Sequence, residues 1–145
     1  MSSKRFEHLG HLRKIREEAL GLRYAQAVGR INALLTRRQE IEQETVQARH
    51  EAVQNLADAG ALPVTGRLWE DFLRGQQHRL RQLDRDMQEA RKVAEQARRV
   101  WEQARVQVRQ MEKLAERLRD EEVQEFKHRE LLALDQTGLD RYRRQ

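Results

Sequence analysis

Residues 80–118 read LRQLDRDMQEARKVAEQARRVWEQARVQVRQMEKLAERL, and apolar side chains recur in them with a seven-residue period. One row consists of Leu80, Met87, Ala94, Trp101, Val108 and Ala115, and a second row of Leu83, Ala90, Ala97, Ala104, Met111 and Leu118. Between the rows nearly every residue is Arg, Glu, Gln, Asp or Lys. Apolar residues at both core positions of about five successive heptads are typical of a coiled-coil seam.

The residues before this repeat predict a second long helix, from about residue 4 to 58. Its apolar stripe consists of Leu9, Leu12, Ile15, Ala19, Leu22, Tyr24, Ala27, Ile31, Leu34, Ile41, Ala48 and Ala52. Arg38 and Thr45 interrupt the stripe at seam positions. Gly10, Gly21 and Gly29 each cost about 1 kcal/mol relative to Ala. A helix of this length tolerates them, and the alternative is that they soften the amino-terminal half.

One break separates the two helical patterns. Gly60 can end the first helix and Pro63 cannot continue it, so we expect a turn at about residues 59–65. Thr65 is then the expected N-cap of a helix over residues 66–135, which Gly138 ends before a basic tail at 136–145. A short connection between long helices makes them antiparallel neighbours. The predicted fold is all-α: one long antiparallel two-helix coiled-coil hairpin, a single elongated domain over residues 1–145.

The register of this hairpin can be predicted. If the chain folds back near residue 62, the numbers of paired residues add up to about 125. Met87 and Leu83 then fall near Arg38 and Ile41, and Trp101 falls beside Tyr24. The small residues Ala90, Ala94 and Ala97 face Leu35, Leu34, Ile31 and Val28. Small residues opposite large ones suit close packing, which favours a hairpin within one chain over a parallel homodimer.

The same register leaves the end of the second helix without a partner beyond about residue 121. There the repeat fails, since Glu122 and Glu125 take the next seam positions. We call Val123–Gln145 the overhang. It carries a new apolar set and a basic end, namely Val123, Phe126, Leu131, Leu132, Leu134, Arg141, Arg143 and Arg144. Such an unpaired amphipathic segment is either frayed or built to bind a partner.

The composition argues against an enzyme. Charged residues make up 37% of the 145 residues, aromatics 5%, and there is no cysteine. A two-helix protein has little interior for a catalytic group. His8 and His11 lack a third ligand, and Glu95 with Arg99 and Glu125 with Arg129 are expected surface ion pairs. We therefore expect no catalytic residue, no metal and no cofactor.

Charge and hydropathy also limit the partners. The formal net charge is +5, but acidic and basic residues alternate, so no basic stripe is dedicated to nucleic acid. No apolar run approaches the roughly 20 residues that span a bilayer, and no signal-peptide pattern opens the sequence. The expectation is a soluble cytoplasmic protein with no membrane insertion and no nucleic-acid partner.

A second apolar cluster follows the predicted turn, with Leu68, Trp69, Phe72 and Leu73 close together. Two interpretations remain open. The cluster can close the hairpin against Leu56 and Leu62, or one edge of it, Phe72 in particular, can be a docking patch.

These features resemble a known family: the flagellar export chaperone FliJ and its injectisome counterpart, the YscO-type type III secretion proteins. Local similarity lies in three segments, TGRLWEDFL at 65–73, Trp101 to Arg117, and KHRELLALD at 127–135 followed by Tyr142-Arg-Arg. The resemblance covers nearly the whole chain. It does not distinguish the flagellar system from the injectisome.

The resemblance implies a two-helix stalk in the centre of the hexameric export ATPase ring, which also contacts the cytoplasmic domain of the export gate membrane protein and handles free export chaperones. The protein would be cytoplasmic, at the periphery of the inner-membrane export apparatus. The implied ring-facing residues are Lys4, Arg5, Arg13, Val123, Phe126, Leu131, Leu134, Arg141, Arg143 and Arg144. The implied gate-facing residues are Trp69, Phe72 and Leu73. Gln76 and Arg79 depart from the family's apolar pattern.

A generic homodimeric coiled-coil scaffold is the alternative function. The two functions predict different oligomeric states, because the stalk is expected to be a monomer.

Overall fold

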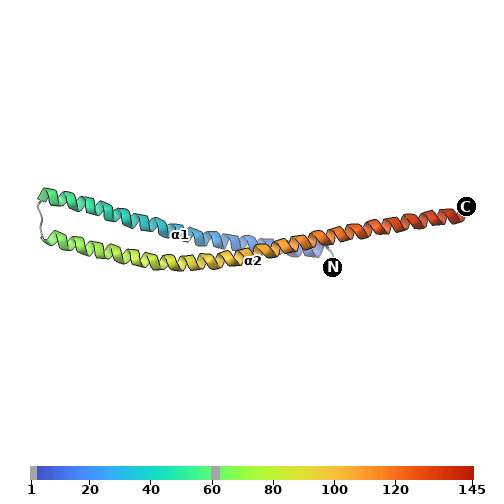
Figure 1. The fold of residues 1–145 in the computed structure, drawn as a ribbon, viewed down its shortest axis with the longest axis horizontal. Helices are drawn as coiled ribbons and strands as arrows, with labels where there is room; N and C mark the ends of the chain where they lie inside the picture. Colours follow the sequence, from blue (N-terminus) through green and yellow to red (C-terminus); the bar gives the residue numbers. More distant parts are fainter. Residues whose placement is uncertain (1–2, 60–62) are drawn as a thin grey trace. The chain divides into compact units, whose positions relative to one another are not determined.

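The computed structural model describes residues 3–59 and 63–145 and contains two long α-helices (Figure 1). Helix α1 spans Ser3–Ala59 and helix α2 spans Pro63–Arg144. They pack against each other as a helical hairpin, so the predicted fold class is confirmed. Helix α1 extends one residue beyond the expected range at each end. The cap expected at Gly60 and the packing expected against Leu62 lie outside the described residues.

Helix α2 begins earlier than expected. Pro63 is its first residue, so Thr65 lies inside the first turn and the prediction of an N-cap at Thr65 is wrong. Proline is well suited to a first helical position because its φ angle is already helical. Its missing N–H group would also have no partner within the helix there.

Helix α2 also ends later than expected. It continues through Gly138 and ends at Arg144, so the separate tail expected at 136–145 is helical except for Gln145. A single glycine costs a helix about 1 kcal/mol relative to alanine, which does not stop a helix without a following proline. Arg141, Arg143 and Arg144 occupy the last turn, where positive charge interacts favourably with the helix dipole.

The contacts divide the chain into two compact units. Unit 2 is the continuous segment Gly21–Arg99, and unit 1 combines the described residues before Gly21 with Val100–Gln145. Each unit contains part of both helices. Each is described by itself below.

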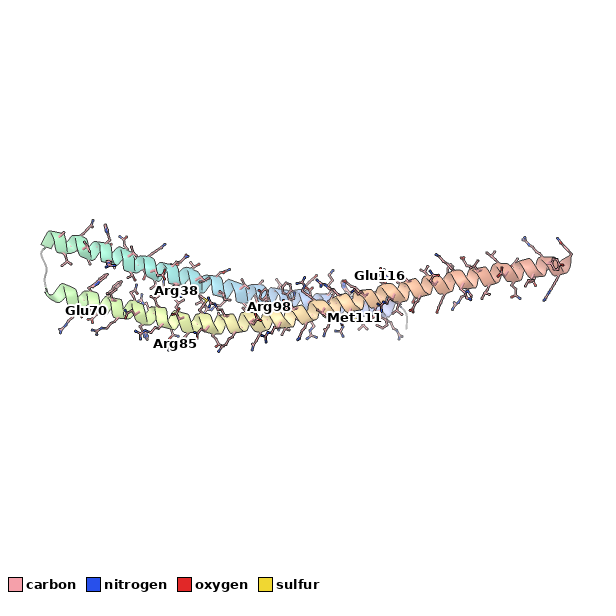
Figure 2. The ribbon with its side chains drawn as sticks, viewed as in Figure 1. Arg38, Glu70, Arg85, Arg98, Met111 and Glu116 are labelled. Atoms are coloured by element: carbon pink, nitrogen blue, oxygen red, sulfur yellow. The ribbon has the colours of Figure 1, made fainter. Side chains whose placement is uncertain are left out.

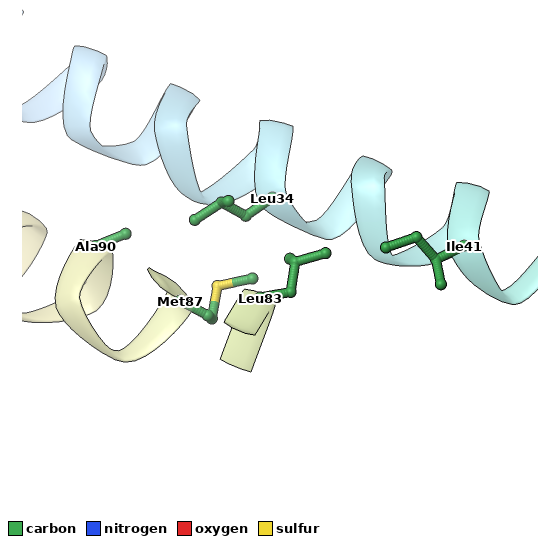
Figure 3. Packing of buried hydrophobic residues seen from close by; sticks show 5 residues of the cluster. All are labelled: Leu34, Ile41, Leu83, Met87 and Ala90. Carbon is green, nitrogen blue, oxygen red and sulfur yellow. The ribbon is translucent and has the colours of Figure 1, made fainter. Parts of the chain in front are cut away.

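The core of unit 2 is a cluster of Leu34 and Ile41 from α1 with Leu83, Met87 and Ala90 from α2 (Figure 3). Ile41 is the most deeply buried of them, with 1% of its surface exposed. Figure 3 shows Leu34 and Ile41 pointing from α1 toward the α2 side chains. The cluster and the ion pair of Arg38 with Asp84 at 3.1 Å agree with the predicted register to within about one helical turn.

A polar layer lies next to this core. Gln76 is buried, and its Nε2 atom donates hydrogen bonds to the Thr45 hydroxyl at 3.2 Å and to the Ile41 carbonyl at 3.4 Å. The Thr45 hydroxyl donates in turn to the Ile41 carbonyl at 2.9 Å. The seam interruption predicted at Thr45 is thus a hydrogen-bonded pair between the helices.

In unit 1 the buried apolar residues of the seam are small. Ala104, Val108 and Ala115 of α2 are buried there. Trp101 is half-buried and donates its indole N–H to Glu17 of α1 at 3.0 Å. The guanidinium carbon of Arg105 lies 4.9 Å from the centre of the Trp101 ring, so a cation–π contact covers its outer face.

Candidate functional site

The overhang is helical, and all of its side chains are exposed among the described residues of unit 1. Every residue from 119 to 145 is exposed, and α2 nevertheless continues to Arg144. Figure 2 shows its side chains projecting from all sides of the helix. An isolated helical segment gains no tertiary packing, which supplies most helical stability in proteins. The overhang is therefore the part of unit 1 that gains most from a partner.

A pair of contacts closes unit 1 where the overhang begins. The Ser3 backbone N–H and hydroxyl donate to the two carboxylate oxygens of Glu122 at 2.9 and 2.8 Å. One turn earlier on α2, Arg119 pairs with Glu7 at 3.1 Å. The hydrogen bonds from the Ser3 backbone and hydroxyl lower the pKa of Glu122. The first N–H groups of a helix have no partner within the helix, and Glu122 accepts a hydrogen bond from one of them at the start of α1.

The expected apolar residues of the overhang are all exposed. Val123, Phe126, Leu131 and Leu134 expose between 50% and 68% of their surface. Leu139 and Tyr142, which were not among the predicted ring-facing residues, are also exposed, at 58% and 79%. Leu139 follows Leu132 by seven residues, and this spacing on one helix face is the signal that would have identified it.

The expected basic residues of this surface lie in unit 1 as well. Lys4 and Arg5 are exposed in the first turns of α1, and Arg141, Arg143 and Arg144 are exposed at the end of α2. Arg13 is exposed but already occupied, because its guanidinium donates to the Gln107 side chain at 2.9 Å. It is therefore less available to a partner than the others.

The second predicted surface lies in unit 2, near the start of α2. The rings of Trp69 and Phe72 stack with their centres 5.6 Å apart, and both residues are half-buried, as is Leu73. Leu68 exposes 64% of its surface and Leu56 of α1 exposes 40%. The cluster is therefore only partly closed against α1, and apolar surface remains available beside Phe72.

The two polar departures from the family pattern have different positions. Gln76 is buried in the seam and is therefore absent from this surface. Arg79 is exposed and reaches toward α1, where it lies 3.8 Å from Glu44. The sequence did not predict that α1 contributes to this surface, where Val46 and Ala48 line a groove together with Phe72. No pattern in the sequence marks this groove, because it depends on how the two helices diverge.

Among residues 3–59 and 63–145, no group of three or more His, Asp or Glu side chains is arranged to hold a metal ion. Within the same residues, no helix is long and apolar enough to cross a membrane.

Residues 2–145 match the family described as Flagellar FliJ protein. The chain belongs to the FliJ family. Neither a curated protein nor a solved structure gives a match to it.

Membership of the FliJ family makes the chain a non-catalytic component of the flagellar export apparatus. The resemblance found in the sequence is thus confirmed over nearly its whole length, and the match is to the flagellar branch. The FliJ-family hairpin presents two exposed surfaces, one in each unit: the overhang with the basic residues near it, and the partly open aromatic cluster around Phe72.

Proposed function

We propose that this FliJ-family protein acts as the central stalk of the hexameric export ATPase ring, and as an escort that links the ATPase to the export gate and to free export chaperones. It would work in the cytoplasm, at the periphery of the inner-membrane export apparatus. Family membership supports a place in this apparatus. The roles of the individual surfaces are our inference.

The overhang carries the proposal. It is a helix of more than five turns whose side chains are all exposed, and its apolar residues have no partner among the described residues of the chain. Exposed apolar side chains rimmed by charge mark a protein interaction site. The exposed Lys4, Arg5, Arg141, Arg143 and Arg144 add positive charge that would attract an acidic partner surface.

The partly open cluster around Phe72 is assigned to the export gate. Trp69, Phe72 and Leu73 present aromatic and aliphatic surface of the kind that dominates binding energy at interfaces. This surface belongs to unit 2 and the overhang belongs to unit 1, so the two partners would bind different residues.

The test is a truncation that ends the chain at Glu122. This variant keeps Glu122 to accept the two hydrogen bonds from Ser3 and removes only the exposed overhang. We expect the hairpin to stay folded, because none of the buried residues lies beyond Ala115. Stimulation of the export ATPase should be lost, as measured by phosphate release with purified ATPase from the same organism.

Circular dichroism provides the control for this experiment, since the melting of the remaining hairpin should change little. A truncated protein that is folded and stimulates the ATPase as well as the full chain would contradict the ring assignment.

A further inference from the structure

We infer that the groove beside Phe72 in unit 2 binds a positively charged amphipathic helix of the partner, and that α1 supplies half of the binding surface. Naming that partner as the export gate rests on the function proposed above. The groove itself is argued from packing and charge.

The packing of unit 2 stops before the turn. Ile41 and Gln76 are buried, but every described side chain at 46–57 and 66–75 is at least partly exposed. Figure 1 shows α1 and α2 farther apart toward the turn than beside the core cluster. Large apolar side chains are present at 46–57 and 66–75, and yet none of those described is fully buried between the two helices.

A groove of about 1120 Å³ lies in this region, lined by α1 between Gln39 and Glu51 and by Phe72 of α2. Its apolar surface comes from Val46, Ala48 and Phe72. Val46 exposes 68% of its surface and lines the same groove as Phe72. The apolar surface is therefore available to side chains of another protein.

The rim of the groove is acidic in a chain that is basic as a whole. Residues 39–52 contain four glutamates and one arginine, whereas the whole chain has a net charge of +5. The groove is lined by all four glutamates, namely Glu40, Glu42, Glu44 and Glu51. Among the described residues, no Lys or Arg lines it.

These glutamates differ in whether a positive charge already lies beside their carboxylate. Glu40 and Glu44 lie 3.1 and 3.8 Å from Arg37, and Glu42 lies 3.4 Å from Arg38. Glu51 instead accepts a hydrogen bond from the neutral amide of Gln47 at 3.2 Å. Its charge is the least compensated on the rim, so an incoming cation gains most there.

A helix fits this groove better than an extended peptide. Glu40, Glu44, Gln47 and Glu51 follow each other at helical spacing, so they form one row along α1 about 16 Å long, or three helical turns. Neither helix of the hairpin has an unpaired strand edge to offer. A third helix that places an apolar stripe against Val46 and Phe72, and Lys or Arg beside Glu51, would complete the core that the two helices leave open.

The binding test uses the full-length protein and a fluorescent 18-residue amphipathic peptide of Leu and Lys, with a Leu and Glu peptide of the same pattern as the control probe. We expect saturable binding of the Lys peptide only, measured by fluorescence anisotropy. Glu51→Lys and Val46→Ser should each weaken it roughly 3- to 10-fold. The matched changes Glu89→Lys and Val93→Ser, at exposed positions of unit 2 outside the groove, should leave it unchanged.

Equal binding of both peptides, or equal losses from the groove variants and the matched variants, would overturn the inference.

A pull-down with the cytoplasmic domain of the export gate distinguishes a failure of this inference from a failure of the proposed function. Phe72→Ala and Glu51→Lys should both reduce gate binding. If the gate does not bind at all while the Lys peptide binds as expected, gate docking fails and the groove stands. If Phe72→Ala reduces gate binding but Glu51→Lys and Val46→Ser do not, the groove is overturned and gate docking stands.

Discussion

Glu95 on α2 is the residue whose ionisation the structure changes most clearly. Two Arg98 nitrogens donate to its carboxylate at 3.0 and 2.7 Å, and Arg99 donates at 3.3 Å. The hydrogen bonds from Arg98 are the largest cause of a pKa lowered from 4.5 to about 2. The predicted pair with Arg99 is confirmed, but Arg98 contributes more. The pair predicted between Glu125 and Arg129 is not among the ion pairs of the described residues.

This arrangement predicts a measurable titration. In Arg98→Ala the pKa of Glu95 should rise toward its ordinary value of 4.5, because the first cause of the shift is removed. Carbon-13 NMR of the carboxyl groups would follow it, with Arg81→Ala, about four helical turns away on the same helix, as the control. Since the folded pKa is the lower one, the stability gained from this contact is present above pH 4.5 and lost as the pH falls toward 2. An unchanged midpoint in Arg98→Ala would contradict the assignment.

At the scale of the helices, we expect the hydrogen-bonded pair of Thr45 and Gln76 to determine the pairing of α1 with α2. Both residues occupy positions where the heptad pattern calls for apolar side chains. A buried polar residue at one core position fixes register and oligomeric state at some cost in stability. Any shift of α2 along α1 would separate the Gln76 amide from the Thr45 hydroxyl and leave buried polar groups unpaired.

The double variant Thr45→Val with Gln76→Leu tests this role. Added apolar burial should stabilise the hairpin by about 1–2 kcal/mol, which raises the melting temperature by roughly 3–8 °C. The loss of the polar pair should also allow other pairings, seen as dimers or a broadened elution profile in size exclusion with light scattering. A variant that is more stable and still entirely one species would show that the pair does not determine the register. Val93→Leu, at an exposed position, is the control.

The apolar patterns were enough to predict both helices, and the position of the break between them predicted the register, because the residue numbers of antiparallel partners add up to a nearly constant sum. Prediction failed where a single residue was given too much weight. Gly138 predicts a helix end and Thr65 predicts an N-cap, but α2 spans Pro63–Arg144 and contains both residues. The groove could not be predicted at all, since Val46 and Phe72 lie on different helices and line one groove only in the folded hairpin.

At the scale of the whole molecule, the seam of α2 is covered by its own chain. Leu34 and Ile41 of α1 pack against Leu83, Met87 and Ala90, so the rows that looked suited to self-association are already occupied in unit 2. Ala104, Val108 and Ala115 are buried in unit 1 in the same way. A parallel homodimer would have to expose these residues before it could form.

We therefore expect a monomer of 17.3 kDa in solution. Multi-angle light scattering over a wide concentration range would measure this mass. The truncation that ends at Glu122 is a useful companion, because a weak dimer held only by the overhang would dissociate in it. A dimer at every practical concentration for both chains would favour the homodimeric scaffold over the stalk.

The hydrogen bonds between Ser3 and Glu122 have a consequence for how such a protein can be adapted. They fix the point at which α2 leaves α1, so the reach of the free segment depends on where α1 starts as well as on where α2 ends. Moving the start of α1 inward by one residue would free about 1.5 Å more of α2. The start of α1 therefore determines how much of α2 is unpaired. The length of the unpaired segment can change while the sequence of the overhang stays the same.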